Sequence, residues 1–398
     1  GGLVAAKPHI MLFAGEYSGN IYGAALANQI KKHCPDVRMS GTGCKEMAEA
    51  GVELLYDSSS WGGIGFIEAL RVFPRLYFIY HKLRRLIEAD RPDALVLIDY
   101  PGFNMFLARL AARLEIPTLY YFPPGKFARE PSEVAEAANI ISSIAAPFRF
   151  TYDIYERAGA KRVEYVGHPL TDVLPLELSK ENACERLALP PDSRVVGLLP
   201  GSRRREIRSH TPMLLQCARR IEKELPNTKF VIPMPDLPGS KIEELIGYVE
   251  ELASAEKAAS GIDVRVTRGL AHETMVASDV LLISSGTATL EATWFDTPMV
   301  IIYKASWLTE FLARKFFYAK LPDHFGLPNI IADRLVVPEY IQADFTEDNI
   351  TNEALRLMTD QEYRKAQLQE IENLKKILAK PGTSKRVAEM ALELVGGK

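Results

Sequence analysis

An aspartate follows an apolar run of the sequence at a position where it could do acid–base chemistry. Leu95–Ile98 is followed by Asp99-Tyr100-Pro101-Gly102-Phe103-Asn104. If the run is a strand of a parallel sheet, Asp99 lies at the carboxyl edge, where its carboxylate can accept the proton of an attacking hydroxyl. The same aspartate could instead cap the next helix or order the Pro-Gly turn. The spacing alone leaves both interpretations open.

A glycine-containing turn follows the first apolar run, in Ala14-Gly15-Glu16-Tyr17-Ser18-Gly19-Asn20. Free backbone N–H groups and the dipole of the helix that follows favour an anion such as phosphate at a turn of this kind. Ser18, Gly19 and Asn20 are therefore candidate binding residues. The turn lacks the G-x-G-x-x-G spacing of a dinucleotide site. Its glycines could serve only to join a strand to a helix.

Two turns in the second half of the chain carry groups suited to binding a nucleoside diphosphate. Gly201-Ser202-Arg203 follows an apolar run, and the guanidinium of Arg203 can bind oxyanions through its planar fork. Ser285-Gly286-Thr287 follows another run, and Glu291 could accept both hydroxyls of a ribose. An ordinary Ser/Thr helix cap with a first-turn glutamate is the alternative for this second turn. We expect the basic residues after Arg203, namely Arg204, Arg205 and Arg208, to lie on a solvated surface.

The segment from Trp61 to Ile87 combines aromatic and basic residues at helical spacing. The candidates for membrane contact are Phe66, Leu70, Phe73, Arg75 and Tyr77. Basic residues beside exposed aromatics are typical of a helix that lies on anionic lipid. The alternative is a core helix with one solvated face, and Pro74 predicts a kink or a break. Glu68, Arg71, Pro74 and Arg75 interrupt the stretch too often for a membrane-spanning helix.

The elements that position these residues alternate along the chain. Apolar runs and helical patterns follow one another, which predicts right-handed βαβ units and parallel sheets covered on both faces. The series restarts near Ser193, so we expect an α/β fold with two Rossmann-like, doubly wound domains that face a cleft. The expected boundaries are 1–170 for the first domain and 171–346 for the second. Helices at 347–398 are expected to pack back on the first domain.

Composition narrows the class of protein. The chain has 398 residues, 47% of them hydrophobic, and a formal net charge of −3. This charge gives no overall attraction to nucleic acid, so we expect no nucleic-acid partner. The four cysteines show no C-x-x-C pair, which disfavours a zinc site and a disulfide framework. With no recognisable signal peptide, a cytoplasmic protein is expected.

Taken in order, these motifs resemble those of the lipid-A-disaccharide synthase family, inverting glycosyltransferases of the GT-B type. Nearly the whole chain takes part in the resemblance. The matching pieces are Gly15-Glu16-x-Ser18-Gly19, Ile98-Asp99-x-Pro101-Gly102-Phe103-Asn104, Gly167-His168-Pro169, Leu199-Pro200-Gly201-Ser202-Arg203 with Glu206, Ser285-Gly286-Thr287-Ala288-x-Leu290-Glu291, Pro298-Met299, Leu327-Pro328-Asn329 and Gln342.

The resemblance implies a reaction and roles for single residues. The family transfers 2,3-diacylglucosamine from UDP-diacylglucosamine to the 6-hydroxyl of diacylglucosamine 1-phosphate, with inversion and without a metal or other cofactor. Asp99 would be the general base and Glu16 would orient the acceptor. The UDP side would comprise Gly201, Ser202, Arg203, Ser285, Gly286, Thr287, Glu291, Asn329 and Gln342. The resemblance further implies a homodimer with exchanged C-terminal regions, peripheral on the cytoplasmic face of the inner membrane.

The chain departs from the family pattern at two places. Asn20 stands where the family usually has Asp, and Gly125-Lys126-Phe127-Ala128-Arg129 stands where a Trp-Ala-Trp segment is usual. Both departures concern the acceptor side. Two alternatives therefore remain: another UDP-sugar enzyme, such as a 2-epimerase or a transferase with a different lipid acceptor, and a paralogue that binds sugar nucleotide without turnover.

Overall fold

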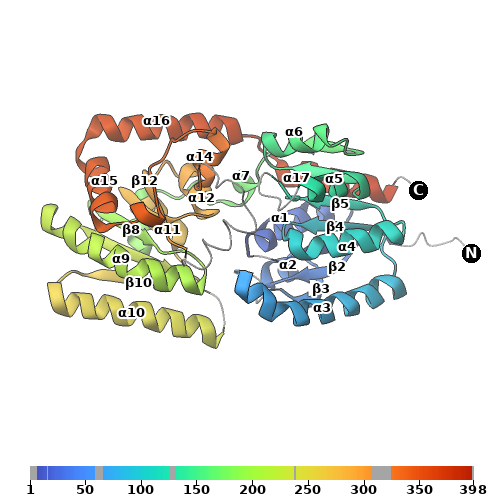
Figure 1. The fold of residues 1–398 in the computed structure, drawn as a ribbon, viewed down its shortest axis with the longest axis horizontal. Helices are drawn as coiled ribbons and strands as arrows, with labels where there is room; N and C mark the ends of the chain where they lie inside the picture. Colours follow the sequence, from blue (N-terminus) through green and yellow to red (C-terminus); the bar gives the residue numbers. More distant parts are fainter. Residues whose placement is uncertain are drawn as a thin grey trace, which may run out of the picture. The chain divides into compact units, whose positions relative to one another are not determined.

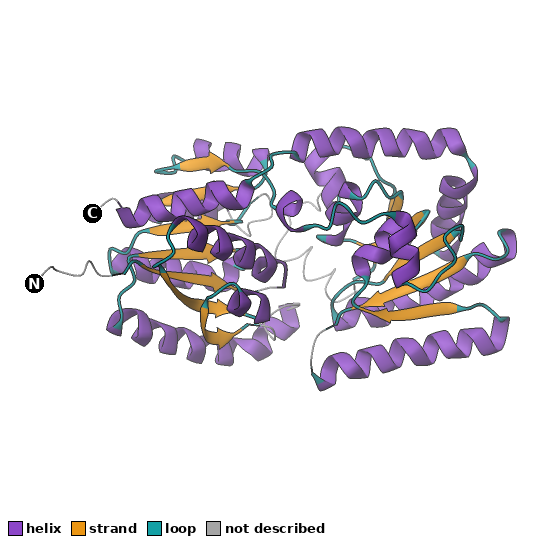
Figure 2. Ribbon diagram, turned by 180° about the vertical axis from the view of Figure 1, so that it is seen from behind, coloured by secondary structure: helices purple, strands orange, loops and turns teal. Residues whose placement is uncertain are grey.

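The computed structural model describes residues 7–15, 17–58, 66–125, 131–236, 239–305 and 324–396. The side chains of residues 66–75, 131 and 240 are not part of the description. Contacts divide the chain into two compact units, 1–173 with 378–398 and 174–377. Each unit is an α/β sandwich with helices on both faces of one sheet (Figures 1 and 2).

The first unit has a seven-stranded parallel sheet in the order β3-β2-β1-β4-β5-β6-β7. Its strands are β1 (His9–Ala14), β2 (Arg38–Gly43), β3 (Glu53–Asp57), β4 (Ala94–Ile98), β5 (Thr118–Tyr121), β6 (Ser143–Ala146) and β7 (Val163–Tyr165). Its helices are α1 (Tyr17–His33), α2 (Lys45–Glu49), α3 (Phe66–Ala89), α4 (Pro101–Arg113), α5 (Pro131–Ile140), α6 (Arg149–Arg157), α7 (Leu170–Val173) and α17 (Thr383–Gly396).

The second unit has a six-stranded parallel sheet in the order β10-β9-β8-β11-β12-β13. Its strands are β8 (Val195–Leu199), β9 (Lys229–Met234), β10 (Val264–Arg268), β11 (Val280–Ser284), β12 (Met299–Tyr303) and β13 (Glu339–Ile341). Its helices are α8 (Lys180–Arg186), α9 (Arg204–Glu224), α10 (Ser240–Ser260), α11 (Ala271–Ala277), α12 (Ala288–Trp294), α14 (Leu327–Ala332), the short 3₁₀ helix η2 (Gln342–Asp344), α15 (Glu347–Thr359) and α16 (Gln361–Leu378).

The central strands are buried along their whole length, as expected for parallel sheets covered on both faces. In the first unit, α1 and α17 cover one face, and α3, α4 and α5 cover the other. In the second unit, α9, α10 and α15 pack on one face, while α11, α12 and α16 pack on the opposite face. The fold class expected from the sequence, an α/β protein with two Rossmann-like domains, is confirmed.

Two expectations about helices need correction. Of the C-terminal helices, only α17 packs on the first unit, against α1; Ile350, Ala354 and Leu357 of α15 complete the core of the second unit instead. Of the kink or break predicted at Pro74, the break is wrong, because α3 continues from Phe66 to Ala89; the kink stays a prediction.

Candidate active site

The order of strands reverses at one point in each sheet, and the predicted catalytic motifs lie there. In the first unit, β1 and β4 are neighbours whose following helices lead to opposite halves of the sheet. In the second unit, β8 and β11 have the same relation. Ligands of doubly wound sheets bind at this switch point, outside the carboxyl ends of the strands. Asp99 follows β4, Arg203 follows β8 and Ser285 follows β11.

The backbone at Asp99 has an uncommon conformation. Asp99 and the next residue, Tyr100, both have positive φ, 51° and 50°. Left-handed conformations of this kind cost about 1–3 kcal/mol each at residues other than glycine, and they persist where neighbouring contacts enforce them. The Asp99 N–H donates to the carbonyl of Tyr121 (2.8 Å), and the Asp99 carbonyl accepts from the Tyr120 hydroxyl (3.1 Å).

Asn104 connects the end of β1 with the turn that follows β4. It is buried, and its Nδ2 donates to the carbonyls of Phe13 (3.2 Å) and Asp99 (2.7 Å). The Asp99 side chain itself is half-buried, so its backbone is fixed while the carboxylate stays within reach of solvent. This is the arrangement that a general base requires.

The glycine turn after β1 has a packing role. A Cβ atom on Gly15 would lie 2.5 Å from the ring of Tyr100, so only glycine leaves room for that ring. Gly19 is buried within α1, and Ser18 is half-buried. Glu16, the predicted acceptor residue, and the segment 126–129 lie outside the described residues.

The side chain of Asn20 lies inside the protein, and its predicted contact with the acceptor stays a prediction. Its side chain is 0% exposed, and its Oδ1 accepts from the N–H of Cys44 (2.7 Å) while Nδ2 donates to Ser58 Oγ (3.4 Å). Asn20 therefore joins α1 to the ends of β2 and β3. The Asn that stands here in place of the family's usual Asp is thus a buried residue.

The turn after β8 is held in place by a side chain of the helix that follows it, α9. Gly201 has φ 116°, and a Cβ there would lie 2.4 Å from Glu206. Glu206 Oε2 accepts from the N–H groups of Ser202 (3.1 Å) and Arg203 (3.2 Å), forming a capping box at the start of α9. Burial raises the pKa of Glu206 despite the opposing effect of Arg203 and these hydrogen bonds. The N–H groups of Ser202 and Arg203 are therefore occupied by a carboxylate of the protein, and contacts of Gly201 and Ser202 with UDP stay predictions.

The guanidinium of Arg203 is accessible to a ligand. The side chain is 45% exposed, and Nη1 lies 3.7 Å from Glu206 Oε1. Burial, with the charge of Glu206, raises the pKa of Tyr303 at the end of β12, and a hydrogen bond and the charge of Arg203 oppose this rise. Glu206 and Tyr303 thus hold Arg203 at the carboxyl edge. Arg204 and Arg208 pair with Glu244 on the surface, which confirms the prediction for these two residues.

His210, which the sequence analysis did not single out, connects the loops after β8 and β12. It is fully buried, its Nδ1 donates to the carbonyl of Pro200 (2.7 Å), and its Nε2 accepts from the N–H of Lys304 (3.1 Å). Because Nε2 accepts, the ring is neutral with its proton on Nδ1. Burial lowers the pKa of His210 below 6.5, although the hydrogen bond to the carbonyl of Pro200 acts in the opposite direction.

The turn after β11 contributes a hydroxyl and a carboxylate. Ser285 Oγ donates to the carbonyl of Phe325 (2.9 Å), and Gly286 and Thr287 are half-buried at the start of α12. Glu291 Oε2 lies 3.1 Å from Nε2 of His272, on α11. His272 was not among the residues predicted from the sequence, although it lies just after the strand β10, a signal that identifies other candidate residues of this site.

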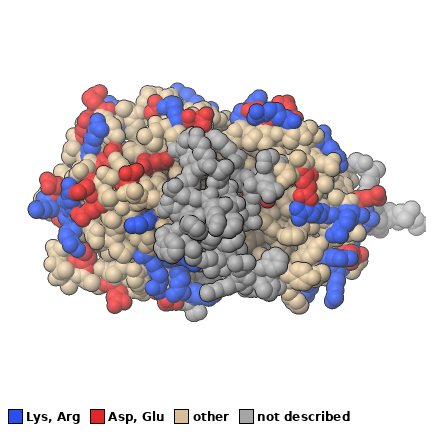
Figure 3. All heavy atoms as spheres, in the orientation of Figure 1, with Lys and Arg blue, Asp and Glu red and all other residues tan. Residues whose placement is uncertain are grey.

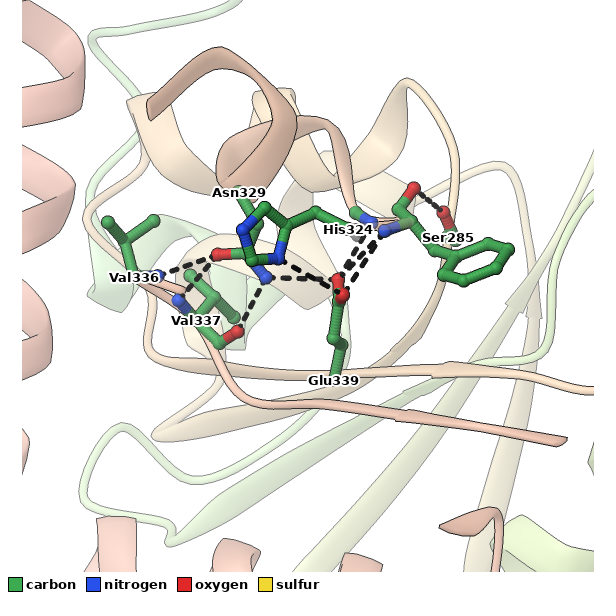
Figure 4. Close-up of polar contacts among 8 residues, drawn as sticks. Ser285, His324, Asn329, Val336, Val337 and Glu339 are labelled. Carbon is green, nitrogen blue, oxygen red and sulfur yellow. Dashed lines mark hydrogen bonds and ion pairs between the residues drawn. The ribbon is translucent and has the colours of Figure 1, made fainter. Parts of the chain in front are cut away.

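Asn329 and Glu339 hold the segment that faces Ser285 (Figure 4). Asn329 is 0% exposed; Nδ2 donates to the carbonyl of Val337 (2.8 Å) and to Glu339 (3.0 Å), and Oδ1 accepts from the N–H groups of Val336 (2.8 Å) and Val337 (2.9 Å). Its amide is thereby saturated by partners within the protein, and a contact between Asn329 and UDP stays a prediction. Glu339 also accepts from the N–H of Gly326 (2.8 Å).

Gln342 is half-buried, and its Oε1 accepts from the N–H of Ala305 (2.6 Å). A contact between Gln342 and UDP stays a prediction. Within the described residues, no group of three or more His, Cys, Asp or Glu side chains could hold a metal ion. Acidic and basic side chains are intermingled over the described surface of the face in Figure 3.

Solved structures with a similar fold include UDP-sugar enzymes. The chain is similar to the UDP-GlcNAc 2-epimerase of Neisseria meningitidis bound to UDP-GlcNAc, with a TM-score of 0.66, 16% identity and coverage of 97% and 100% of the two chains. It is also similar to the S. aureus MnaA–UDP structure, with a TM-score of 0.65, 13% identity and coverage of 98% and 97%. At such low identity these likenesses show the fold alone, that of GT-B-like UDP-sugar enzymes.

The sequence comparisons are more specific. The family model for lipid-A-disaccharide synthetase matches residues 10–394. A lipid-A-disaccharide synthase of Geobacter sulfurreducens is 37% identical, with 97% of each chain covered, and that of Geobacter metallireducens is 35% identical, with 99% of each covered. The chain belongs to the lipid-A-disaccharide synthetase family. It is a glycosyltransferase with a UDP-sugar and a lipid acceptor as substrates, and the epimerase and non-catalytic alternatives are not favoured.

The neutral state of His210 predicts a pH dependence of stability. The unfolded chain binds a proton at His210 near pH 6.5, whereas the folded chain binds it only at lower pH, so stability falls as the pH drops below 6.5. The loss is at most about 1.4 kcal/mol per pH unit. Urea unfolding at pH 7.5 and 5.5 should show a smaller pH-dependent loss in His210→Gln than in wild type. His33→Gln, on the exposed end of α1, should keep the wild-type difference; an unchanged difference in His210→Gln would contradict the account.

Proposed function

We propose that the enzyme divides its two substrates between its two switch points. The second unit holds the UDP of UDP-2,3-diacylglucosamine, and the first unit holds 2,3-diacylglucosamine 1-phosphate with Asp99 as general base. Transfer to the 6-hydroxyl then proceeds with inversion and releases UDP. The observation that carries this proposal is that Asp99 lies at the β1/β4 switch point, while Arg203 and Ser285 lie at the β8/β11 switch point.

Asp99 suits the removal of a proton from the acceptor hydroxyl. Its backbone is fixed by Tyr120, Tyr121 and Asn104, whereas its side chain is only half-buried. A base fixed in this way loses little orientational freedom when the reaction occurs. Glu16 completes the acceptor side in this proposal on the strength of the family resemblance, together with Ser18 and Gly19.

Arg203 suits the stabilisation of the leaving group. Departure of UDP leaves negative charge on the diphosphate, and a guanidinium already positioned at that place stabilises the charge without reorganisation. Glu206 and Tyr303 supply the positioning. We assign the ribose hydroxyls to Glu291, whose carboxylate can accept from both of them, and the phosphates to Arg203 and the 285–287 turn.

We further propose that the surface of α3 and α4 lies on the membrane. Tyr77 is 58% exposed, Phe78 66% and Phe106 43%. Beside them, Tyr80, Phe106, Arg109 and Arg113 line a hollow of about 380 Å³. Aromatic and basic side chains together suit the interface of an anionic bilayer. No described helix is both long and apolar enough to cross a membrane.

Among the predicted membrane contacts, the side chains of Phe66, Leu70, Phe73 and Arg75 lie outside the described ones, and Tyr77 is exposed. Attachment to the inner face of the inner membrane and a homodimer with exchanged C-terminal regions are parts of the proposal supported by the family resemblance.

Two single substitutions should separate chemistry from binding. Asp99→Asn should lower kcat by about 10²–10⁴-fold, the usual contribution of a general base, and should leave the Kd of UDP unchanged. Arg203→Ala should raise the Kd of UDP by about tenfold or more through loss of a charge-assisted hydrogen bond. Arg204→Ala, whose partner Glu244 lies on the surface, is the matched control and should behave as wild type. Full turnover in Asp99→Asn would remove Asp99 as the base, and wild-type UDP affinity in Arg203→Ala would remove Arg203 from the site.

Vesicle sedimentation tests the membrane surface. Tyr77→Ser and Phe78→Ser should each reduce binding to phosphatidylglycerol-containing vesicles by about tenfold, since burying an aromatic side chain is worth about 1.5–3 kcal/mol. Leu335→Ser is the control, because Leu335 is similarly exposed (60%) but lies on the second unit. Equal losses in all three variants, or no loss in the first two, would contradict membrane contact by α3.

A further inference from the structure

One ion pair at the carboxyl edge of the second sheet joins Glu291 to His272, a residue with no part in the function described so far. His272 Nε2 lies 3.1 Å from Oε2 of Glu291, and the two side chains are 35% and 22% exposed. His272 is the second residue of α11, and Glu291 is the fourth residue of α12. The two helices are neighbours on the same face of the second sheet (Figure 1).

The main chain before α11 fixes the place of His272. Gly269 and Leu270 both have positive φ, 72° and 40°, so the chain turns sharply between β10 and α11. The N–H of Gly269 donates to the carbonyl of Met234 (2.9 Å), and the Thr274 hydroxyl donates to the carbonyl of Leu270 (2.8 Å). The imidazole also packs against the ring of Phe295, with 5.6 Å between ring centroids. His272 therefore approaches Glu291 from a rigid support.

The charges around His272 favour its protonated form. Burial lowers its pKa, but the hydrogen bond to Glu291 and the charges of Glu291 and Glu273 outweigh burial, and the net pKa is raised above 6.5. Glu273 is the acidic neighbour on its own helix and is paired with Arg186 of α8 (2.8 Å). The contact with Glu291 is thus a charge-assisted hydrogen bond that strengthens as His272 gains a proton.

A carboxylate that is already fixed binds a ligand at a lower cost in conformational entropy than a mobile one. A free glutamate side chain gives up rotamer freedom when it binds a ligand, and prior fixation removes that cost. A carboxylate has two oxygens, so one can be held by His272 while the other receives hydroxyl groups.

We propose that His272 is a positioning residue, which through its contact with Glu291 Oε2 holds that carboxylate for the ribose hydroxyls of the UDP donor. The inference rests on the proposed role of Glu291. It assigns the preference for a ribonucleotide over a deoxyribonucleotide to the pair His272 and Glu291.

Calorimetric affinities for UDP and 2′-deoxy-UDP test the pair. The ratio of the two Kd values measures recognition of the ribose hydroxyl, and a general loss of folding would not shift it selectively. Wild type should prefer UDP by about 10- to 100-fold, the usual contribution of a hydrogen bond to a charged group. Glu291→Ala should reduce the ratio to about one. His272→Phe, which keeps a ring against Phe295, should lower it at least about threefold, and His272→Gln, which keeps a donor, should restore most of it.

The outcomes separate the two claims. If Glu291→Ala loses the preference for UDP but His272→Phe keeps it, the role of His272 is overturned and that of Glu291 stands. If Glu291→Ala keeps the preference, the ribose role of Glu291 is overturned, and the inference with it. Glu273→Gln, the neighbouring change on α11, should keep the wild-type ratio. A loss there as large as in His272→Phe would show that any disturbance of α11 suffices and would also overturn the assignment.

Discussion

Buried polar side chains that tie down the loops at the carboxyl edge of each sheet are the constraint on which the site depends. A parallel sheet leaves unpaired backbone groups where its strands end, and buried groups of this kind need partners. Asn104 supplies them between β1 and β4, and His210 supplies them between β8 and β12. Asn329 supplies partners to the chain before β13, at the amino end of that strand. Each of these side chains is buried and uses its polar atoms within the protein.

The residues of the family motifs are therefore of two kinds. Asn20, Glu206 and Asn329 are turned inward and hold the loops in place. The side chains of Asp99, Arg203 and Glu291 keep some exposure, and these are the residues to which we assign the reactive part of the site. A short motif thus carries both the support and the chemistry, because a loop that must present one side chain accurately needs another side chain to fix its backbone.

The sequence predicted the strands, the switch-point loops and the positions of Asp99, Arg203 and Glu291, because apolar runs followed by polar turns identify the carboxyl ends of buried strands. It could not show that the amides of Asn20 and Asn329 face inward, since their partners are fixed only by the fold. It missed His210, whose partner Lys304 is 94 residues away, for the same reason. Helical periodicity likewise identified the C-terminal helices but could not tell which sheet lacked cover, so α15 was expected on the wrong unit.

The central claim is that the β8/β11 switch point binds UDP and that the β1/β4 switch point carries the base. Hydrogen exchange measured by mass spectrometry, with and without UDP, tests it most directly. The account predicts slower exchange over residues 199–206 and 284–292, with little change over 95–104. Slower exchange confined to 95–104, with no change in the two segments of the second unit, would contradict it.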